Sequence, residues 1–514
     1  MTPVRLQSQQ APSADADAAL RELADGVLMP CFDGLVAPDW LLRRVVGGLG
    51  GVCLFARNIG TPEQVRSLTG SLLSLRNKLV IAVDEEAGDV TRLDAATGSR
   101  FPGAAALGRA DDTELTREIG YQVGVLLRGA GISLNFAPSA DVAVDRSNPV
   151  IGTRSFGADP ELVARHAVAF LTGQQEAGVH ACVKHFPGHG DTATDSHLSL
   201  AVVATDGAGM ARVALPPFAA AITAGVAAVM TGHLVIPAVD DLPASLSPRW
   251  TTDILRGEMG FDGVVVTDAL EMAAIAGNYG TAGGAVLALR AGADLLCLGG
   301  EDAGEVMLDQ VRDAIVHAVQ QGELSVQRLT DAAARVRSLA VPIEPDDRAA
   351  RQAAAAQAAS AADLMSAADL ASAAALEIAG PLPQLGAAPG DERALVLRCD
   401  EPGSLAVGIV PWGLAAAGAD VTEVPLRRGE PLPLNALRSA AAVALLTRDL
   451  HRHHWMSDLL ADVRASRPDA VLVEMGSATI DGIAPPAIAS HGASVANARA
   501  VAAALGLNSR GPQS

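Results

Sequence analysis

The densest group of ionisable side chains lies in one segment, KHFPGHGDTATDSHLSL, which spans residues 184–200. Asp195 and His197 are two positions apart in it, so the carboxylate can hold the imidazole ring and stabilise its protonated form. Such a pair can move a proton near neutral pH, which is what general acid–base catalysis needs. The residues alone favour such a catalytic role no more than a structural role in loop hydrogen bonds.

The same segment also suggests a metal site, because histidine and carboxylate side chains are common metal ligands. Its ionisable residues from 185 onwards are His185, His189, Asp191, Asp195 and His197. Glycine and proline interrupt the segment, so these side chains need not share one face. A hydrolytic metal site would also usually draw ligands from other strand ends. A metal-dependent hydrolase that uses residues 185–197 is therefore the rival hypothesis from another mechanistic class.

Asp268 is a second candidate, because it directly follows the fully apolar run GVVVT at 263–267. A carboxylate at the end of such a run is expected to project into a poorly solvated opening. There it can act as a nucleophile or stabilise a developing cation. The alternative is the N-cap of a helix that begins with ALEMAAI, and position alone favours that alternative.

These candidates follow short apolar runs, which predict the elements that position them. Each run is continuously hydrophobic, as expected of parallel strands covered on both faces. The runs are GVLMPCF (26–32), GGVCLF (50–55), LVIAV (79–83), ISLNF (132–136), VHACVK (179–184), AAVMT (227–231), GVVVT (263–267) and DLLCL (294–298). Helix starts at Thr61-Pro62 and Asp159-Pro160 lie between them. Eight such strands predict a (β/α)8 barrel, with a doubly wound sheet as the alternative; no GxGxxG loop supports the latter.

In a barrel the loops after the strands converge on one cavity, so polar residues that follow strands are candidate site residues. They are Arg57, Asn58, Asp84, Glu85, Glu86, Arg92, Asn135, Asp141, Arg154, Lys184, His185, His189, His233, Asp268 and Glu271. So many ionisable groups around one cavity are costly unless a polar ligand satisfies them. Their common placement predicts an active or binding site.

The rest of the chain divides by composition. We expect a polar, disordered lead-in, the barrel, an Ala-rich helical connector ended by Pro381 and Pro383, and a smaller α/β sandwich domain. The predicted boundaries are 1–21, 22–342, 343–380 and 381–514. The smaller domain is predicted from the runs ALVLRC (394–399), ADVTEVPL (419–426), AAVALLT (441–447) and DAVLVEM (469–475), with a helix near 497–505. Three histidines at 451, 453 and 454 are interpreted as a solvated helix start.

Composition excludes several classes of function. The formal charge is −20, with no long basic run, so nucleic-acid binding is not expected. The sequence has no uninterrupted stretch of about 20 apolar residues, so a membrane span is not expected. Five scattered cysteines without a CxxC pair are typical of buried, reduced thiols. The N-terminal residues lack the apolar region of a signal peptide, so we expect a cytoplasmic protein.

Taken together, the motifs resemble glycoside hydrolase family 3, and more narrowly its β-N-acetylglucosaminidase branch. The resemblance rests on KHFPGHGD…DSH and GVVVTDALEM, supported by GGVCLFARNI, DEEAG…R, LNFAPSADV, NPVIGTRSFG and MTGHLVIPAVD…PASLS. These motifs cover roughly residues 22–340 in the family's order, each at a predicted strand end. The smaller domain resembles the second domain of two-domain members only loosely.

The resemblance implies a role for each matching residue. Asp268 would be the nucleophile, forming a covalent glycosyl-enzyme with retention of configuration, and His197 would be the acid/base, oriented by Asp195. The residues implied to hold the terminal sugar are Asp84, Arg92, Arg154, Lys184 and His185, and those implied to shape the pocket are Arg57, Asn58, His189 and His233. No metal and no organic cofactor is implied. The chain departs from the family's Glu-Gly-Gly-Arg pattern in reading Glu86-Ala87-Gly88-Asp89, which reverses a charge.

The implied activity is release of terminal β-GlcNAc from small glycosides, with cell-wall fragments as substrates. Four alternatives remain. A histidine base carries no negative charge, so with Lys184, Arg92 and Arg154 nearby the acceptor can be phosphate instead of water, which would make the protein a phosphorylase. The others are a β-glucosidase, the metal-dependent hydrolase, and a sugar-binding protein in which Asp268 is only a helix cap. The expected partner is a small glycoside, with neither nucleic acid nor membrane.

Overall fold

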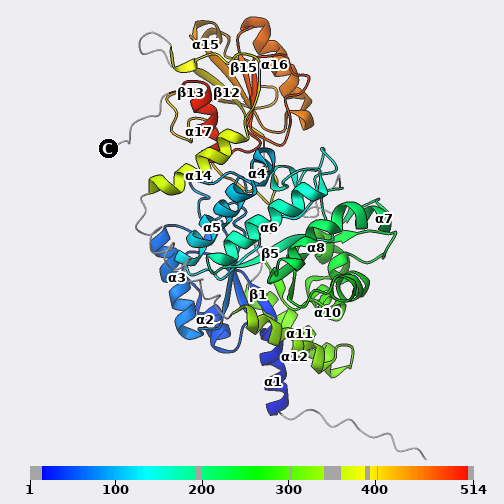
Figure 1. Ribbon diagram of the computed structural model, residues 1–514. Helices are drawn as coiled ribbons and strands as arrows, with labels where there is room; N and C mark the ends of the chain where they lie inside the picture. Colours follow the sequence, from blue (N-terminus) through cyan, green and yellow to red (C-terminus); the bar gives the residue numbers. More distant parts are fainter. Residues whose placement is uncertain are drawn as a thin grey trace, which may run out of the picture.

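The structure is a computed structural model that describes residues 14–192, 200–300, 304–340, 361–387, 394–401 and 403–507. A barrel domain forms the lower part of the molecule in Figure 1, and a smaller α/β domain, here called the second domain, lies above it. Helices α4 and α5 of the barrel contact helix α14 of the second domain. Within the described ranges, no helix has both the length and the apolar character that crossing a membrane requires.

Parallel strands form the barrel. In the described residues they are β1 (Leu28–Pro30), β2 (Gly51–Leu54), β3 (Val80–Val83), β4 (Leu134–Asn135), β5 (His180–Phe186), β7 (Ala228–Thr231), β9 (Val264–Thr267) and β10 (Leu296–Leu298). The sheet runs β2-β3-β4-β5-β7-β9, a bridge from Val266 to Leu295 continues it towards β10, and β10 pairs with β1. At the remaining seam, Gly50 N donates to Asp25 O at 2.9 Å. Each of the eight apolar runs is a strand, so the barrel prediction is confirmed.

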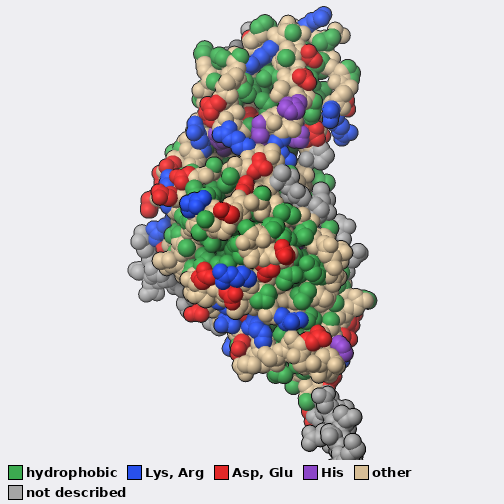
Figure 2. All heavy atoms as spheres, turned by 90° about the vertical axis from the view of Figure 1, so that its right-hand side faces the viewer, with side chains coloured by type: hydrophobic (Ala, Val, Ile, Leu, Met, Phe, Trp, Pro, Cys, Tyr) green, Lys and Arg blue, Asp and Glu red, His purple; other side chains and the backbone are tan. Residues whose placement is uncertain are grey.

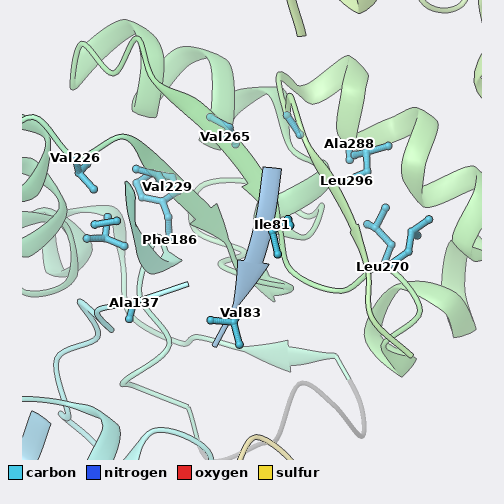
Figure 3. Packing of buried hydrophobic residues seen from close by; sticks show 14 of the residues in the cluster. Ile81, Val83, Ala137, Phe186, Val226, Val229, Val265, Leu270, Ala288 and Leu296 are labelled. Atoms are coloured by element: carbon cyan, nitrogen blue, oxygen red, sulfur yellow. The ribbon is translucent and has the colours of Figure 1, made fainter. Parts of the chain in front are cut away.

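Both faces of the barrel strands are buried, which explains why the runs are hydrophobic throughout. One set of side chains packs against the surrounding helices, and Figure 3 shows Leu296 of this layer beside Ala288 of helix α10 and Val229 beside Phe186. The other set fills the barrel interior. Several interior residues are small or flexible, among them Met29, Cys53, Ala82, Cys182, Ala228 and Cys297. All five cysteines are free and buried, as predicted.

Helices cover the barrel. They are α1 (Ala14–Asp25), α2 (Asp39–Val46), α3 (Pro62–Leu75), α4 (Ala104–Ala110), α5 (Thr113–Gly129), α6 (Pro160–Glu176), α7 (Gly207–Gly209), α8 (Leu215–Thr223), α9 (Ala273–Tyr279), α10 (Thr281–Ala291), α11 (Glu305–Gln320) and α12 (Val326–Leu339). The predicted starts of α3 and α6 are confirmed: Thr61 Oγ1 accepts from Gln64 N at 3.2 Å and Asp159 Oδ1 from Glu161 N at 3.1 Å.

Short elements interrupt the barrel's strand–helix alternation. They are the 3₁₀ helices η1 (Ala56–Asn58), η2 (Gly152–Arg154) and η4 (Ala244–Leu246), the π-helices η3 (Met210–Ala214) and η5 (Arg249–Glu258), and the parallel strand pair β6 (Ala201–Val202) and β8 (Leu234–Val235). Strand β6 resumes the chain just after residues 193–199, where the described structure has a gap. It pairs with β8, the strand that follows β7 in the chain.

The second domain is one sheet of order β11-β16-β15-β14-β12-β13 with helices around it. Its strands are β11 (Glu377–Ala379), β12 (Leu395–Cys399), β13 (Thr422–Leu426), β14 (Val443–Thr447), β15 (Val471–Glu474) and β16 (Ala487–Ala489). Its helices are α14 (Ala361–Ala374), α15 (Leu434–Ser439), α16 (His454–Ser466) and α17 (Val495–Ala504), with 3₁₀ turns η6 (Leu385–Ala387) and η7 (Leu450–Arg452). The prediction of a helical connector over 343–380 is wrong at its end, because Glu377–Ala379 pairs antiparallel with β16 as an edge strand.

Candidate active site

Two cations and two carboxylates meet at the carboxyl ends of β3 and β5. Lys184 Nζ forms ion pairs with Asp84 and, at 2.7 Å, with Glu86 Oε1. Arg154, which ends the 3₁₀ helix η2, donates to Glu86 in a bidentate pair, from Nε at 2.9 Å and from Nη2 at 2.7 Å. Three of the five residues implied to hold a sugar are thus brought together, with Glu86 as the shared partner of both cations.

This four-residue cluster is buried and internally neutral. The side chains of Lys184, Arg154 and Glu86 are 2%, 5% and 5% exposed, whereas Asp84 at 19% faces more solvent. Burial alone would raise the pKa of Glu86, but the guanidinium of Arg154 and the ammonium of Lys184 outweigh it and hold that pKa well below its usual range. Burial likewise lowers the pKa of Lys184, yet Asp84 and Glu86 raise it above the ordinary value. Glu86 and Lys184 therefore both stay charged.

His185 contacts the cluster through Arg154, and the buried carboxylate of Asp141 fixes its ring. Its Nδ1 donates to Asp141 Oδ2 at 2.6 Å, which leaves Nε2 to accept from Arg154 Nη2 at 3.2 Å. Asp141 is fully buried and also accepts from His189 N at 2.6 Å and from Ser139 Oγ at 2.9 Å. Burial would raise the pKa of Asp141, but His185 outweighs this and lowers it. His185 is thereby presented in one tautomer and orientation.

Asp268 lies directly after β9 and is half-buried, and both its backbone and its side chain bond to neighbouring backbone groups. Its N donates to Thr231 O at 3.0 Å, and its Oδ1 accepts from Ala269 N at 2.8 Å. Buried His233 supports the next residue, because its Nε2 donates to Ala269 O at 2.9 Å while Nδ1 accepts from Ser245 Oγ at 2.8 Å. His233 therefore acts on the backbone beside Asp268.

The helix-cap interpretation of Asp268 is wrong. Helix α9 begins at Ala273, with Met272 at the N-cap, so residues 269–272 form a turn and not the first turn of a helix. Met272 makes no side-chain cap hydrogen bond. Asp268 is therefore not the N-cap of α9.

Arg57 and Asn58, which end η1, hold backbone together. Asn58 Nδ2 donates to Phe32 O at 2.8 Å and to Gly34 O at 2.9 Å, whereas Arg57 reaches Gly299 O at 3.2 Å and Gly300 O at 3.3 Å. These bonds join the loops after β1, β2 and β10, so both residues shape the rim of the barrel.

Other predicted residues lie elsewhere. Arg92 Nη2 donates to Ala406 O of the second domain at 2.8 Å, which directs its guanidinium towards the domain interface. Asp195 and His197 fall within residues 193–199, outside the described residues. Among the residues that are described, no group of three or more His, Cys, Asp and Glu side chains has a geometry that could hold a metal ion.

Sequence reasoning assigned no role to Glu85, Glu86, Asp141 or Glu271, although it placed all four after strands. Glu85 is 1% exposed, and its Oε2 accepts from Arg92 N at 2.9 Å and Leu93 N at 3.0 Å, which shapes the loop after β3. Glu271 Oε1 accepts from Gly299 N at 2.7 Å. Burial raises the pKa of each of these two glutamates to about 7. Their placement after strands was the available signal; the contacts themselves depend on loop conformation.

His189 should make stability depend on pH. Its side chain is buried, with Nδ1 bonded to Thr192 Oγ1 at 2.9 Å, and burial together with neighbouring His185 lowers its pKa from 6.5 to about 4. Between pH 6.5 and about 4, His189 is protonated in the unfolded chain but stays neutral in the folded chain. The contribution of neutral His189 to the free energy of unfolding is therefore fully present above pH 6.5 and is lost as pH falls towards 4. We expect the difference in unfolding free energy between the wild type and His189→Asn to shrink by about 2 kcal/mol from about pH 7 to about pH 5.

Denaturant unfolding of both proteins at each pH measures this difference, and His454→Asn at an exposed position serves as the control. Parallel curves for the wild type and His189→Asn across this range would contradict a neutral, buried His189.

Comparison with known proteins agrees with this geometry. Residues 37–339 match the glycosyl hydrolase family 3 N terminal domain. A beta-hexosaminidase from Chromobacterium violaceum is 42% identical over 272 residues, which cover 50% of this chain and 74% of that protein. The structure of a glycoside hydrolase family 3 beta-N-acetylglucosaminidase from Paenibacillus sp. str. FPU-7 has a TM-score of 0.81 and 31% identity, and the match covers 95% of this chain and 96% of that one. Native NagZ from Neisseria gonorrhoeae has a TM-score of 0.51 and 32% identity, and the match covers 62% of this chain and 98% of that one.

The matched family domain spans more than half of the sequence and coincides with the barrel that carries the charged cluster. The protein therefore belongs to glycoside hydrolase family 3 and is a glycoside hydrolase.

Proposed function

We propose that the protein is a retaining exo-β-N-acetylglucosaminidase that removes terminal β-linked GlcNAc from small glycosides. The observation that carries the proposal is the buried, internally paired cluster of Asp84, Glu86, Arg154 and Lys184, which lies at the carboxyl-terminal end of the barrel strands, as Asp268 does. Carboxylate oxygens accept from sugar hydroxyls, while guanidinium and ammonium groups donate to hydroxyl and acetamide oxygens. The Paenibacillus relative is named a beta-N-acetylglucosaminidase, which supports the same sugar, and the Chromobacterium relative is named a beta-hexosaminidase.

In the proposed first step, a carboxylate oxygen of Asp268 forms a bond to the anomeric carbon of the bound sugar. The glycosidic bond breaks, its electron pair stays on the leaving oxygen, and His197 supplies a proton to that oxygen. In the second step His197 takes a proton from water, the water oxygen bonds to the anomeric carbon, and Asp268 is released as a carboxylate. Two inversions give net retention. Asp195 is proposed to orient the ring of His197 and stabilise its charged form.

The sugar-binding residues are proposed to be Asp84, Lys184, Arg154, His185 and Arg92. Asp84 is the most exposed member of the charged cluster, which suits direct contact with hydroxyl groups. Glu86 and Asp141 are proposed to hold the cations and the imidazole in place from behind. As natural substrates we propose small cell-wall fragments with a terminal GlcNAc.

A paired assay tests the proposed function. Turnover of an aryl β-N-acetylglucosaminide should exceed turnover of the matching aryl β-glucoside, and a GlcNAc-terminated cell-wall disaccharide should release free GlcNAc. Activity on the glucoside alone would replace the proposal with a β-glucosidase, and binding without turnover would replace it with a sugar-binding protein. Chelator should leave the rate unchanged, since the proposed steps use no metal; loss of activity with chelator would favour the metal-dependent alternative.

His197→Ala should slow substrates with poor leaving groups most, because only these need full protonation in the first step. For a leaving group that departs unaided, the first step should be nearly normal and the second step should become limiting. Pre-steady-state measurement across a series of aryl leaving groups tests this, with the exposed His317→Ala as the matched control. Equal losses across the series in the first step would argue against His197 as the proton donor.

Water is proposed as the acceptor, and the charge balance of the site supports it over phosphate. Lys184 and Arg154 are both paired with carboxylates, so the charge with which these two cations would attract a phosphate dianion is already compensated. Arg92 has its guanidinium directed to Ala406 O of the second domain. At equal ionic strength, turnover in phosphate buffer should therefore equal turnover in a non-phosphate buffer. Faster release in phosphate together with α-GlcNAc-1-phosphate as product would establish the phosphorylase instead.

A further inference from the structure

The turn at residues 86–90, which follows β3, carries two buried carboxylates with different partners. Its backbone is tight: Glu86 N donates to Val90 O at 3.0 Å, and Ala87 and Gly88 both have left-handed backbone, with φ of 65° and 61°. Glu86 holds Arg154 and Lys184 in the barrel. Asp89, whose side chain is 3% exposed, bonds to the second domain. One rigid turn therefore connects the sugar-binding cluster to the domain interface.

Asp89 accepts three hydrogen bonds, two of them from the second domain. Arg448 Nη2 donates to Oδ2 at 3.0 Å, Ala493 N donates to Oδ1 at 3.1 Å, and Thr153 Oγ1 of the barrel donates to Oδ2 at 2.7 Å. A carboxylate this buried needs such donors, since an unpaired one would be strongly disfavoured. This pairing accounts for an aspartate at the position where the family pattern suggested an arginine.

Arg448 is itself held ready by the second domain. It follows strand β14, and its guanidinium lies 5.3 Å from the ring centre of Trp412. Arg398 lies 5.2 Å from the same ring, donates to Trp412 O at 3.0 Å and pairs with Glu423 at 3.2 Å. Stacking on an aromatic face suits arginine and limits its freedom. The cation thus reaches Asp89 from a fixed platform.

The neighbouring element, the 3₁₀ helix η2, is held by the same turn. Its adjacent residues Thr153 and Arg154 bond to Asp89 and Glu86 respectively. A shift of the turn would therefore move Arg154 as well as Glu86. Because Glu86 is also the partner of Lys184, the shift would reach both cations of the sugar-binding cluster.

Other polar bonds also join the second domain to the barrel: Arg92 Nη2 donates to Ala406 O at 2.8 Å, His451 Nε2 to Arg146 O at 2.6 Å and Val495 N to Ser99 O at 2.9 Å. Where the two domains meet, a cavity of about 770 Å³ opens between barrel residues such as Arg109 and Arg146 and second-domain residues such as His451 and Asp481. Figure 2 shows basic and histidine side chains gathered around this junction. Close packing is interrupted there, so discrete polar bonds have a larger part in setting the position of the domain.

We propose that Asp89 and Arg448 form an interdomain clamp through which the second domain sets the position of the turn at residues 86–90, and with it the sugar-binding arrangement of Arg154 and Lys184. Both are positioning residues, because neither is placed against the substrate. The inference rests on the proposed function only in taking the cluster as the sugar site. It makes the second domain part of the binding machinery of the barrel.

Arg448→Gln and the near-isosteric Asp89→Asn test the clamp from its two sides. Each should raise KM for an aryl β-N-acetylglucosaminide, and the inhibition constant for free GlcNAc, by roughly tenfold, with a smaller change in kcat. The double variant should be no worse than the worse single variant, since both remove one interaction. Arg448→Lys, which keeps the charge, should recover part of the loss.

Arg464→Gln is the matched control. Arg464 donates to Ala484 O at 2.7 Å and Pro486 O at 2.8 Å, so its loss weakens the second domain without touching the barrel. Its KM should stay near that of the wild type even if its Tm falls. A KM increase in Arg464→Gln equal to that in Arg448→Gln would overturn the clamp, because general weakening of the domain would then explain both.

Hydrogen exchange gives a readout that needs no substrate and so separates the clamp from the proposed function. In Arg448→Gln and Asp89→Asn, amides in peptides covering 86–93 and 150–155 should exchange faster than in the wild type or Arg464→Gln. Unchanged exchange in both segments would overturn the clamp, whatever the enzyme hydrolyses. Faster exchange in a protein that fails to turn over GlcNAc glycosides would support the clamp and refute the proposed function.

Discussion

Asp268→Asn should abolish nearly all turnover while leaving the fold and sugar binding intact. Asparagine matches aspartate in shape, and its Oδ1 can keep the bond from Ala269 N, so the turn that follows β9 should be preserved. It lacks the anionic oxygen that attacks the anomeric carbon. A loss of about 10³-fold or more in kcat is expected when a covalent catalyst is removed.

Steady-state kinetics with an aryl β-N-acetylglucosaminide measure the loss, and calorimetric titration with GlcNAc checks binding. Asp262→Asn, an exposed aspartate before the same strand, is the matched control and should behave as the wild type. If Asp268→Asn turned over at near-normal rate, Asp268 would have to be removed from the mechanism.

Glu86→Gln should have the second largest effect, on binding and on stability together. The substitution removes the charge that Arg154 and Lys184 share, and it points an amide donor at groups that are themselves donors. Breaking a buried ion pair from one side costs about 3–5 kcal/mol, because the remaining charges are left uncompensated. We expect a loss of that size in unfolding free energy, and a fall of about 10²–10³-fold in kcat/KM.

The matched control is Glu176→Gln, which breaks a more exposed pair with Arg117 on the outer helices. Exposed pairs contribute about 0–1 kcal/mol, so this variant should unfold close to the wild type and retain full activity. If Glu86→Gln and Glu176→Gln lost equal amounts of unfolding free energy and of kcat/KM, the buried cluster would not be what holds the sugar-binding residues in place.

The barrel was predictable because its physical cause is visible in the sequence. Strands buried on both faces must be hydrophobic throughout, and each such run became a barrel strand. The short edge strand Glu377–Ala379 was not predictable in this way. It follows a long Ala-rich segment with high helix propensity, and only its pairing with Ala487–Ala489 makes it a strand.

The positions of the site residues were predictable, but their partners were not. In the run Asp84-Glu85-Glu86, the first and third carboxylates meet Lys184, while Glu85 turns to the backbone of Arg92 and Leu93. All three follow one strand, so spacing alone cannot say which carboxylate serves which purpose.

Contacts across the domain interface are harder still to predict. Asp89 and Arg448 are 359 residues apart, and nothing in the sequence near either residue indicates the other. Arg92 Nη2 likewise donates to Ala406 O, 314 residues away, and the sequence around Arg92 does not indicate this bond. Such pairs depend on how the barrel and the second domain pack against each other, which local sequence patterns do not encode.

Trapping the covalent intermediate shows directly whether Asp268 is the nucleophile. His197→Ala should be mixed with an aryl β-N-acetylglucosaminide whose leaving group departs without protonation, so that the first step proceeds while the second is slowed. After acid quench and proteolysis, mass spectrometry should find one N-acetylglucosaminyl group on the peptide that contains Asp268, and none in Asp268→Asn. An adduct on another carboxylate such as Glu271, or turnover with no adduct under these conditions, would contradict Asp268 as the nucleophile of a retaining mechanism.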